Sequence, residues 1–378
     1  MPVWQYGNAK VHVHTSFQTI AERPAPVRSG GALLWLRRNL FSDVATSAAT
    51  LVICALLLWL LPPLLQWALA HAVWQGNASA CGAPEAGACW AVIAEKYRVI
   101  LFGRYPFGEQ WRPLAATALV ITSVVASCTR VLPARHLAPL WVGVLAIFLL
   151  LMYGNVRGLS KVETDRWGGL PLTVLLATLS SALAFPLAIL LALGRRSALP
   201  AVRAVCTVYI ELVRGVPLIS VLFVASFMLP LLLPQGFSID VLLRVLAGIT
   251  LFAAAYMAEV VRGGLQAVPR GQLEAADMLG LSYWQTQRHV VLPQALATVV
   301  PGLMNNFIAI FKDTSLVTIV SLYELTGALD LALNADALWR PYKIEGYIFI
   351  ALVYFGFCFA MSRYSLHIEK TLYRGNVR

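Results

Sequence analysis

Charged side chains inside or beside apolar segments are the residues of this sequence whose types could do chemistry. The 378-residue chain holds 59% hydrophobic and only 12% charged residues, so each such charge stands out. An ionisable group is costly within a hydrocarbon phase, and there it marks a candidate site for binding a polar group or moving a proton. The candidates are Glu211, Arg214, Arg244, Glu259, Arg262, Lys312, Asp313 and Glu324.

Most of these charges lie near the ends of apolar segments, where a long side chain reaches the membrane surface at little cost. For Arg214, Arg244 and Arg262 we therefore favour anchoring at the interface. Lys312 and Asp313 are adjacent, so they cannot face each other on a helix and each needs another partner.

A further polar feature lies within the apolar segment 296–311. We expect Pro301 and Gly302 to break its helix, and the segment also carries the amides of Asn305 and Asn306. Interrupted membrane helices line transport cavities, where freed backbone groups meet polar solutes. Hydrogen bonding between helices explains the amides equally well. The predicted substrate path consists of Asn306, Lys312, Asp313 and Glu324.

Catalytic motifs are missing from the sequence. There is no Gly-Lys dipeptide, so no G-x-x-x-x-G-K-[ST] phosphate-binding loop can form. H-E-x-x-H, C-x-x-C and G-x-S-x-G are absent as well. Four scattered cysteines lack metal-ligand spacing and are expected to pack: Cys54, Cys128, Cys206 and Cys358. We predict no catalytic residue, no metal site and no cofactor bound by this chain.

The composition indicates a polytopic helical membrane protein. The net charge of +11 could suggest nucleic acid in a soluble protein, but Lys and Arg sit mostly between apolar segments, as the positive-inside rule places them. We therefore predict membrane lipid and no nucleic acid as a partner. The expected spans are 44–70, 114–129, 138–153, 167–194, 216–233, 240–262, 296–311 and 344–361, with an interfacial helix over 202–213 and a bend at 214–217.

Eight spans place both termini on one side of the membrane. Lys and Arg are more frequent in the segments that this topology assigns to the inside, which include the basic tails 1–43 and 363–378. We read the first tail as polar and partly disordered. Cys81 and Cys89 then lie outside, where an oxidising compartment would permit a disulfide. Two free thiols remain the alternative, because spacing does not establish geometry.

The longest polar interruption of the C-terminal half covers 272–295. We expect one short helix that ends at Gly280 and a second that begins at Ser282, where Ser282 and Gln285 have the spacing of a capping box. Pro293 is expected to end the second helix. A helix-turn-helix elbow between spans indicates a docking surface, or else an amphipathic hairpin held by the membrane surface.

The elbow also carries a spaced motif. Glu274-Ala275-Ala276, three residues, Gly280, nine residues, Val290, one residue and Leu292-Pro293 resemble the EAA-x3-G-x9-I-x-LP motif of permease subunits of bacterial binding-protein-dependent ABC importers, with Val at the Ile position. Further segments resemble the polar amino acid permeases: Arg214-Gly215 with Pro217-Leu218, Ala258-Glu259 with Arg262-Gly263-Gly264, Gly271-Gln272, Leu292-Pro293-Gln294-Ala295 and Lys312-Asp313-Thr314-Ser315-Leu316. With its additional N-terminal spans, the chain most resembles a permease of the general L-amino acid uptake systems.

This resemblance implies an all-α permease in the bacterial inner membrane with cytoplasmic termini. The domains would be a tail (1–43), three extra helices with a periplasmic loop (44–166) and a five-helix core (167–378) with a cytoplasmic coupling loop (263–293). The loop would dock in a groove of an ATP-binding-cassette ATPase dimer, which binds ATP and Mg²⁺. The implied coupling residues are Glu274, Ala275, Ala276, Gly280, Leu292 and Pro293. The other implied partners are a second, paralogous permease and a periplasmic amino-acid-binding protein.

Two other classes of protein are compatible with the spans. An ATP-independent secondary transporter or channel for small polar solutes predicts an internal repeat and carboxylates at mid-membrane, whereas no clear repeat is visible and the acids cluster near span ends. A membrane scaffold that transports nothing would not need the EAA spacing. The sequence leaves open which amino acids are carried.

Overall fold

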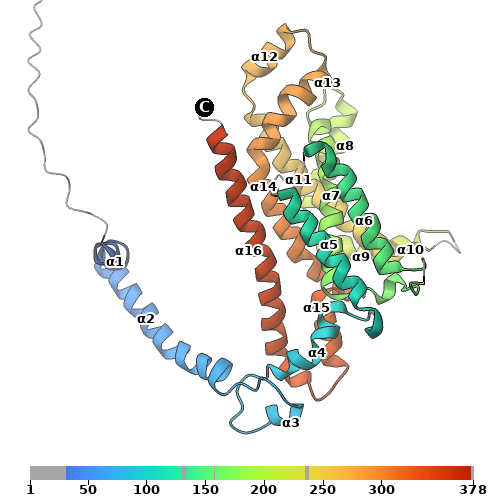
Figure 1. The fold of residues 1–378 in the computed structure, drawn as a ribbon. Helices are drawn as coiled ribbons and strands as arrows, with labels where there is room; N and C mark the ends of the chain where they lie inside the picture. Colours follow the sequence, from blue (N-terminus) through green and yellow to red (C-terminus); the bar gives the residue numbers. More distant parts are fainter. Residues whose placement is uncertain (1–30, 129–132, 157, 235–237, 376–378) are drawn as a thin grey trace, which may run out of the picture. The chain divides into compact units, whose positions relative to one another are not determined.

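The computed structural model describes residues 31–128, 133–156, 158–234 and 238–375, and Figure 1 shows their helices. The described chain is helical without strands, apart from two isolated bridges. It falls into two compact units, Met1–Gln66 and Trp67–Arg378. Residues 1–30 of the predicted tail lie outside the described part, while Ala32–Leu40 within that tail forms helix α1.

The first unit consists of α1 and α2 (Val44–Leu65), joined by a short turn. Asp43 caps α2 by accepting the Thr46 N–H at 2.8 Å, and the Thr50 hydroxyl donates to the Leu40 carbonyl at 2.7 Å. The helix continues as a π-helical turn to Ala70, and Val44–Ala70 is long and apolar enough to cross a membrane. The first predicted span is therefore confirmed.

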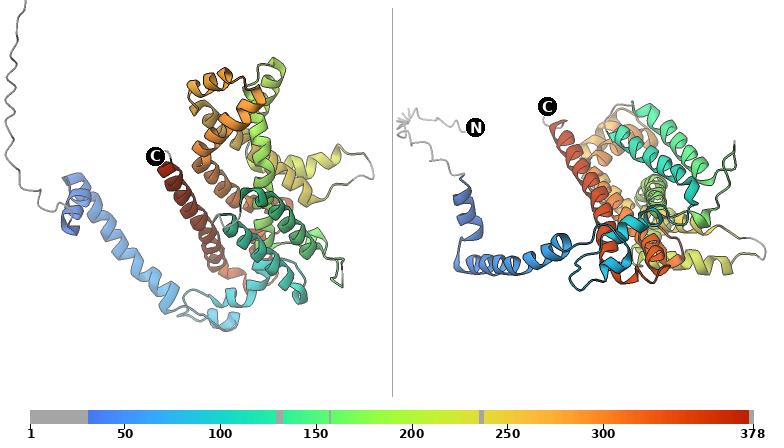
Figure 2. Two further views of the ribbon diagram at one scale, coloured as in Figure 1. Left: turned by 45° about the horizontal axis from the view of Figure 1, so that its top comes forward. Right: turned by 60° about the horizontal axis from the view of Figure 1, so that its bottom comes forward.

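The second unit is a bundle around α7 (Gly169–Arg195), α11 (Val241–Ala267), α14 (Leu292–Asp313) and α16 (Lys343–Gly375) (Figure 2). Small residues let these helices approach closely. A Cβ atom on Gly264 of α11 would lie 2.6 Å from the carbonyl oxygen of Ala295 on α14, so only glycine fits this contact. The helices α5 (Trp111–Cys128) and α6 (Leu137–Tyr153) pack as a pair against the bundle.

Five helices of the described chain could cross a membrane by length and composition, or six if a bent pair counts as one span. That pair is α8 (Pro200–Arg214) with α9 and α10 (Leu218–Leu231), and its bend of 104° confirms the one predicted at 214–217. Pro217 sets this bend, because it cannot continue the hydrogen bonding of α8. With the shorter α5 and α6 included, the fold agrees with about eight spans.

The second unit has two ends. At one end the Arg196 guanidinium donates to the Leu265 carbonyl at 2.7 Å, so α7 and α11 finish side by side, and the short helices α12 (Arg270–Met278) and α13 (Tyr283–Thr286) project beyond them (Figure 1). We call this the elbow end. At the opposite end, α15 (Leu325–Asn334) packs against α4 (Ala91–Phe102) and α16. α16 runs from there towards the elbow end.

Helix α14 corrects two expectations. Tyr283–Val320 is one continuous helical stretch of 38 residues, so Pro293 does not end the second elbow helix and Pro301 does not break the span. Pro293 lies in the first turn of α14 after a π-helical turn (Gln287–Val291), where its missing N–H costs little. Pro301 is tolerated inside a membrane helix. The helix changes instead at Thr314–Val320, which is 3-10 helical.

A small cap covers the end opposite the elbow. It contains α3 (Ala78–Cys81) and α4, and Cys81 is bonded to Cys89 with a Cα–Cα distance of 5.6 Å. The Cys89 N–H donates to Oε1 of the buried Glu345 at 2.9 Å, which attaches the cap to the first turns of α16. Apolar residues of α4, α15 and α16 form a second core beneath it.

Candidate functional site

The turn of the elbow is built by local hydrogen bonds. Gly280 follows α12 with φ of 70°, a left-handed conformation that costs glycine nothing. The Leu281 N–H donates to the Ala276 carbonyl at 3.2 Å and the Gly280 N–H to the Asp277 carbonyl at 2.9 Å, the two bonds of a Schellman motif. A capping box at Ser282 and Gln285 then starts α13. Both features were predicted from the sequence and are confirmed.

The motif residues divide into two groups by exposure. Ala276 is only 2% exposed and lies where α12 packs against the π-helical turn, so a larger side chain would push the two helices apart. Leu292 is half-buried. The exposed motif residues are Glu274, Ala275, Gly280 and Pro293. The Gln294 amide also donates to the Gln272 side-chain oxygen at 3.3 Å, which connects α12 to α14.

An apolar tip, formed by Met278, Leu279, Tyr283 and Trp284, surrounds the turn. Met278 is 90% and Leu279 is 78% exposed, and both aromatic rings are exposed and meet edge to face at 5.3 Å. Sequence reasoning did not single out these four residues, although their position on both sides of Gly280 was a usable signal. Exposed apolar side chains grouped in this way mark an interaction surface.

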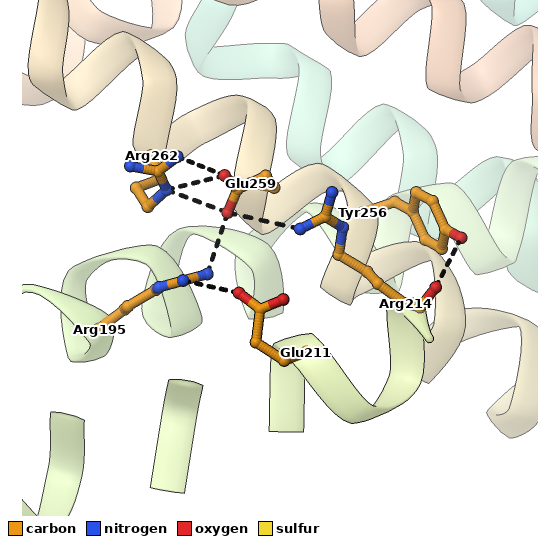
Figure 3. Close-up of polar contacts among 6 residues, drawn as sticks. All are labelled: Arg195, Glu211, Arg214, Tyr256, Glu259 and Arg262. Atoms are coloured by element: carbon orange, nitrogen blue, oxygen red, sulfur yellow. Dashed lines mark hydrogen bonds and ion pairs between the residues drawn. The ribbon is translucent and has the colours of Figure 1, made fainter. Parts of the chain in front are cut away.

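Beneath the elbow lies a group of charged residues that we call the Glu259 cluster: Arg195, Glu211, Arg214, Glu259 and Arg262 (Figure 3). Arg262 Nε donates to both carboxylate oxygens of Glu259, at 2.9 Å and 3.0 Å, and its Nη2 donates to Oε1 as well. Arg195 donates to Glu259 at 3.1 Å and to Glu211 at 2.7 Å. The cluster thereby joins α7, α8 and α11.

Arg214 is the loosest member of the cluster. Its Nη1 lies 3.9 Å from Glu259 Oε2, and its guanidinium lies over the Tyr256 ring at 5.7 Å from the centroid. The Tyr256 hydroxyl donates to the Arg214 carbonyl at 3.3 Å (Figure 3). Within the described residues, Nε of Arg214 is buried without a hydrogen-bond partner.

These contacts give partners within the protein to the three arginines for which we expected anchoring at the interface. Arg262 and Arg214 are directed at Glu259 within the protein. Arg244 donates a hydrogen bond to the Ser226 carbonyl. In a regular helix that carbonyl would accept from the N–H four residues later, but this residue is Pro230, which has no N–H. The Glu259–Arg262 pair is local, three residues apart on α11, whereas residues farther along the chain supply the partners of Arg214 and Arg244.

Glu324 is fully buried at the opposite end of the bundle. Its carboxylate caps α15, where the helix dipole favours a negative charge. It accepts hydrogen bonds from the hydroxyls of Thr173 (3.4 Å), Thr318 (3.0 Å) and Tyr354 (2.8 Å) and from the N–H groups of Thr326 (2.9 Å) and Gly327 (3.0 Å). Glu324 therefore connects α7, the 3-10 turn, α15 and α16.

The other predicted substrate-path residues lie on α14. The Asn306 amide donates to the Gly302 carbonyl of its own helix at 2.9 Å. Lys312 is exposed and Asp313 is half-buried in the last turn. Among the described residues, no group of three or more His, Cys, Asp and Glu could hold a metal ion.

Helices of membrane length packed into a bundle define a polytopic membrane protein, with an exposed elbow at one end. Residues 184–372 match the model of the family described as the binding-protein-dependent transport system inner membrane component, and the chain belongs to this family of multi-pass inner-membrane transport components. The elbow and the Glu259 cluster both lie within the matched residues.

Named relatives extend over nearly the whole chain. The inner membrane amino-acid ABC transporter permease protein YhdY of Escherichia coli is 48% identical over 93% of this chain and 96% of its own length. The glutamate/glutamine/aspartate/asparagine transport system permease protein BztC of Rhodobacter capsulatus is 38% identical over 95% of this chain and 99% of its own. A crystal structure of an amino acid ABC transporter with histidines is 30% identical over 54% of this chain and 92% of its own, with a TM-score of 0.48.

Proposed function

We propose that this chain is the membrane-spanning permease subunit of an ATP-driven importer of L-amino acids, and that its elbow couples it to a separate ATPase. The observation that carries the proposal is the apolar tip on the EAA motif. Water exposure of Met278 and Leu279 is unfavourable by about 25 cal/mol per Å² of apolar surface, and a partner groove would relieve it. The amino-acid substrate class is supported by the names of both long relatives.

The proposed partners follow from what the chain lacks and from its family. Without a Gly-Lys dipeptide it builds no phosphate-binding loop, so an ATP-binding-cassette dimer supplies ATP hydrolysis and binds ATP and Mg²⁺. This chain then binds no cofactor and performs no catalysis. The family description supports a periplasmic amino-acid-binding protein as the donor of substrate. A second permease, which the resemblance indicates to be a paralogue, completes the membrane part.

In the proposed orientation the elbow end faces the cytoplasm. Arg195 and Arg196 lie at this end, as the positive-inside rule favours, and the end of α16 lies there too (Figure 1). The end of α16 is then cytoplasmic, and the predicted eight spans would place the N-terminal tail on the same side. The cap with Cys81 and Cys89 faces the periplasm, where its disulfide would persist. The division into a tail (1–43), added helices (44–166) and a core (167–378) remains part of the proposal.

The proposed substrate path follows the end of α14. Lys312 and Asp313 offer opposite charges to the carboxylate and ammonium groups of an amino acid, and Asn306 lies about two turns before Asp313 on the same face of α14. Glu324 is the weakest of the four predicted residues for this role, because its carboxylate already accepts five hydrogen bonds. Its surroundings support a structural role.

The test compares the whole assembly with the chain alone. An affinity-tagged chain should retain the ATPase on purification, and Glu274→Lys should abolish both this retention and ATP-driven amino-acid uptake while the protein still inserts in the membrane. Uptake by the purified chain alone would refute the proposal and favour the ATP-independent transporter. Normal ATP-driven uptake by Glu274→Lys in an intact complex would refute the docking role of the elbow.

A further inference from the structure

The Glu259 cluster connects the elbow to the bend between α8 and α9. Glu259 and Arg262 lie in the last turns of α11, which continues through Pro269 into α12. Arg195 comes from the last turn of α7. Arg214 is the last residue of α8, where the chain turns by 104° into α9. One carboxylate therefore contacts the helix that holds the elbow and the residue at the bend (Figure 3).

The three arginines compete for too few carboxylates. Arg262 holds Glu259 through a bidentate contact, the strongest arrangement for this pair. Arg195 is shared between Glu259 and Glu211. Arg214 has the weakest contacts of the three: it lies 3.9 Å from the Glu259 carboxylate and over the Tyr256 ring. Within the described chain its Nε has no hydrogen-bond partner. Of the three, Arg214 can leave Glu259 at the lowest cost.

We infer that Glu259 is a positioning residue that transmits movement of the elbow to the α8–α9 bend through Arg214. This inference rests on the proposed function, because it requires an ATPase that moves the elbow. When α11 shifts, Glu259 and Tyr256 both move with it, and Arg214 either follows α11 or loses its contacts to these two residues. Packed helix ends with alternative ion pairs change between discrete arrangements, and this property lets a small displacement at the elbow alter the bend.

A purely structural role of Glu259 and a role in transmitting movement predict different effects on uptake and ATP hydrolysis. If the cluster only holds the three helices together, neutralising Glu259 lowers stability, and uptake and ATP hydrolysis fall together. If Glu259 transmits movement, the ATPase still docks and hydrolyses ATP, while less amino acid crosses per ATP. The ratio of uptake to hydrolysis separates the two roles.

The experiment uses the complete transporter in proteoliposomes, with a radiolabelled amino acid for uptake and phosphate release for hydrolysis in the same vesicles. Glu259→Gln preserves side-chain size and removes the charge. We expect the ratio of uptake to hydrolysis to fall about 10-fold, within the usual range of coupling between sites. Glu259→Asp retains the charge and should recover part of the ratio.

A second variant avoids the risk that Glu259→Gln fails to assemble. Arg214→Gln removes the loosest partner and should lower the ratio in the same direction. The double variant should be no worse than Glu259→Gln alone, because residues that act as one unit are not additive. The matched control is Glu163→Gln, which removes an exposed carboxylate that is paired with Lys161 outside the cluster and should leave the ratio unchanged.

The inference is overturned if Glu259→Gln and Arg214→Gln keep the wild-type ratio, or if uptake and hydrolysis fall in parallel with thermal stability. A wild-type assembly that shows no ATP-driven uptake would instead refute the proposed function and is recognised before any variant is made. A reduced ratio in both variants with near wild-type hydrolysis supports the inference.

Discussion

Gly280 illustrates how one residue sets the shape of the elbow. Its φ of 70° lies in the left-handed region, while a Cβ atom there would meet nothing within 4 Å. The requirement for glycine is therefore conformational and not steric. A substitution at Gly280 therefore reports on backbone strain without a steric clash.

We expect Gly280→Ala to weaken ATPase binding, because an L-residue with a Cβ costs about 1–2 kcal/mol in the left-handed conformation. This corresponds to an approximately 5- to 30-fold loss of affinity if all of the strain opposes docking. Gly280→Asn should lose less, since Asn adopts this conformation more readily. Titration of the ATPase onto the permease in detergent measures both. Gly143→Ala, also in open space but without positive φ, is the control. Equal affinity for Ala and wild type would contradict the argument.

Glu324 permits a second prediction for a single residue, this time on stability. Glu324→Ala leaves several buried donors without an acceptor, and each such group costs about 1–3 kcal/mol. Glu324→Gln keeps one oxygen for the N–H groups of Thr326 and Gly327 and should cost less. Thermal unfolding in detergent should thus rank wild type above Gln and Gln above Ala. The exposed Glu85→Ala should match wild type, and an unchanged midpoint for Glu324→Ala would disprove the role.

Among the elements, α11 and α14 depend on close approach at glycine. The neighbouring Gly263 and Gly264 differ sharply in environment: a Cβ on Gly263 would meet nothing within 4 Å, whereas on Gly264 it would lie 2.6 Å from the Ala295 carbonyl oxygen and from Val299 Cγ1. The Ala295 carbonyl belongs to the backbone of α14, so it cannot move aside as a flexible side chain could. The helix pair would have to separate.

We therefore expect Gly264→Ala to destabilise the protein by about 1–3 kcal/mol, the usual cost of overpacking. Gly263→Ala is a matched control on the same helix and should be neutral or stabilising by up to about 1 kcal/mol, since Ala favours helix. The measurement is the thermal midpoint of each purified variant together with ATP-driven uptake. Equal midpoints for the two variants would show that α11 and α14 do not pack as described.

The predictability of the elements depended on the range of their interactions. Gly280 and the Ser282–Gln285 capping box act within a few residues, so the sequence predicted the elbow turn correctly. Pro293 and Pro301 were misjudged, because a π-helical turn and the membrane environment decide whether proline ends a helix. Apolar length alone predicted the boundaries of α7 and of the Leu218–Leu231 segment within a few residues, whereas the helical stretch that contains α14 and helix α16 extend well beyond the predicted spans.

The Glu259 cluster as a whole was not predictable, because it depends on contacts between residues that are distant in the sequence. Arg195 is 64 positions from Glu259 and 16 from Glu211, so no local pattern connects them. The sequence favoured membrane anchoring for Arg214 and Arg262, because each lies near a span end. Glu259 and Arg262 are neighbours on α11, but only the side-by-side ends of α7 and α11 and the bend after α8 bring Arg195 and Arg214 to this pair.

At the scale of the whole molecule, the second unit divides its features between two ends. The elbow, the Glu259 cluster and the end of α16 share one end, and the disulfide-bonded cap, Glu324 and α15 share the other (Figure 1). If the elbow docks on an ATPase, the first group must face the cytoplasm and the second the periplasm. Locating either end relative to the membrane therefore tests the orientation proposed for the other end.

Single cysteines at Asp277 in the elbow and at Glu85 in the cap should react from opposite sides, because both positions are exposed and lie at different ends of the bundle. With Cys54, Cys128, Cys206 and Cys358 replaced by Ser to remove the other thiols, a membrane-impermeant maleimide should label Glu85→Cys in intact spheroplasts. It should label Asp277→Cys only after the membrane is opened. A cysteine at Arg270, at the start of α12, serves as a second elbow position and should follow Asp277→Cys. Labelling of both ends from one side would contradict the orientation, and the elbow could then not reach ATP.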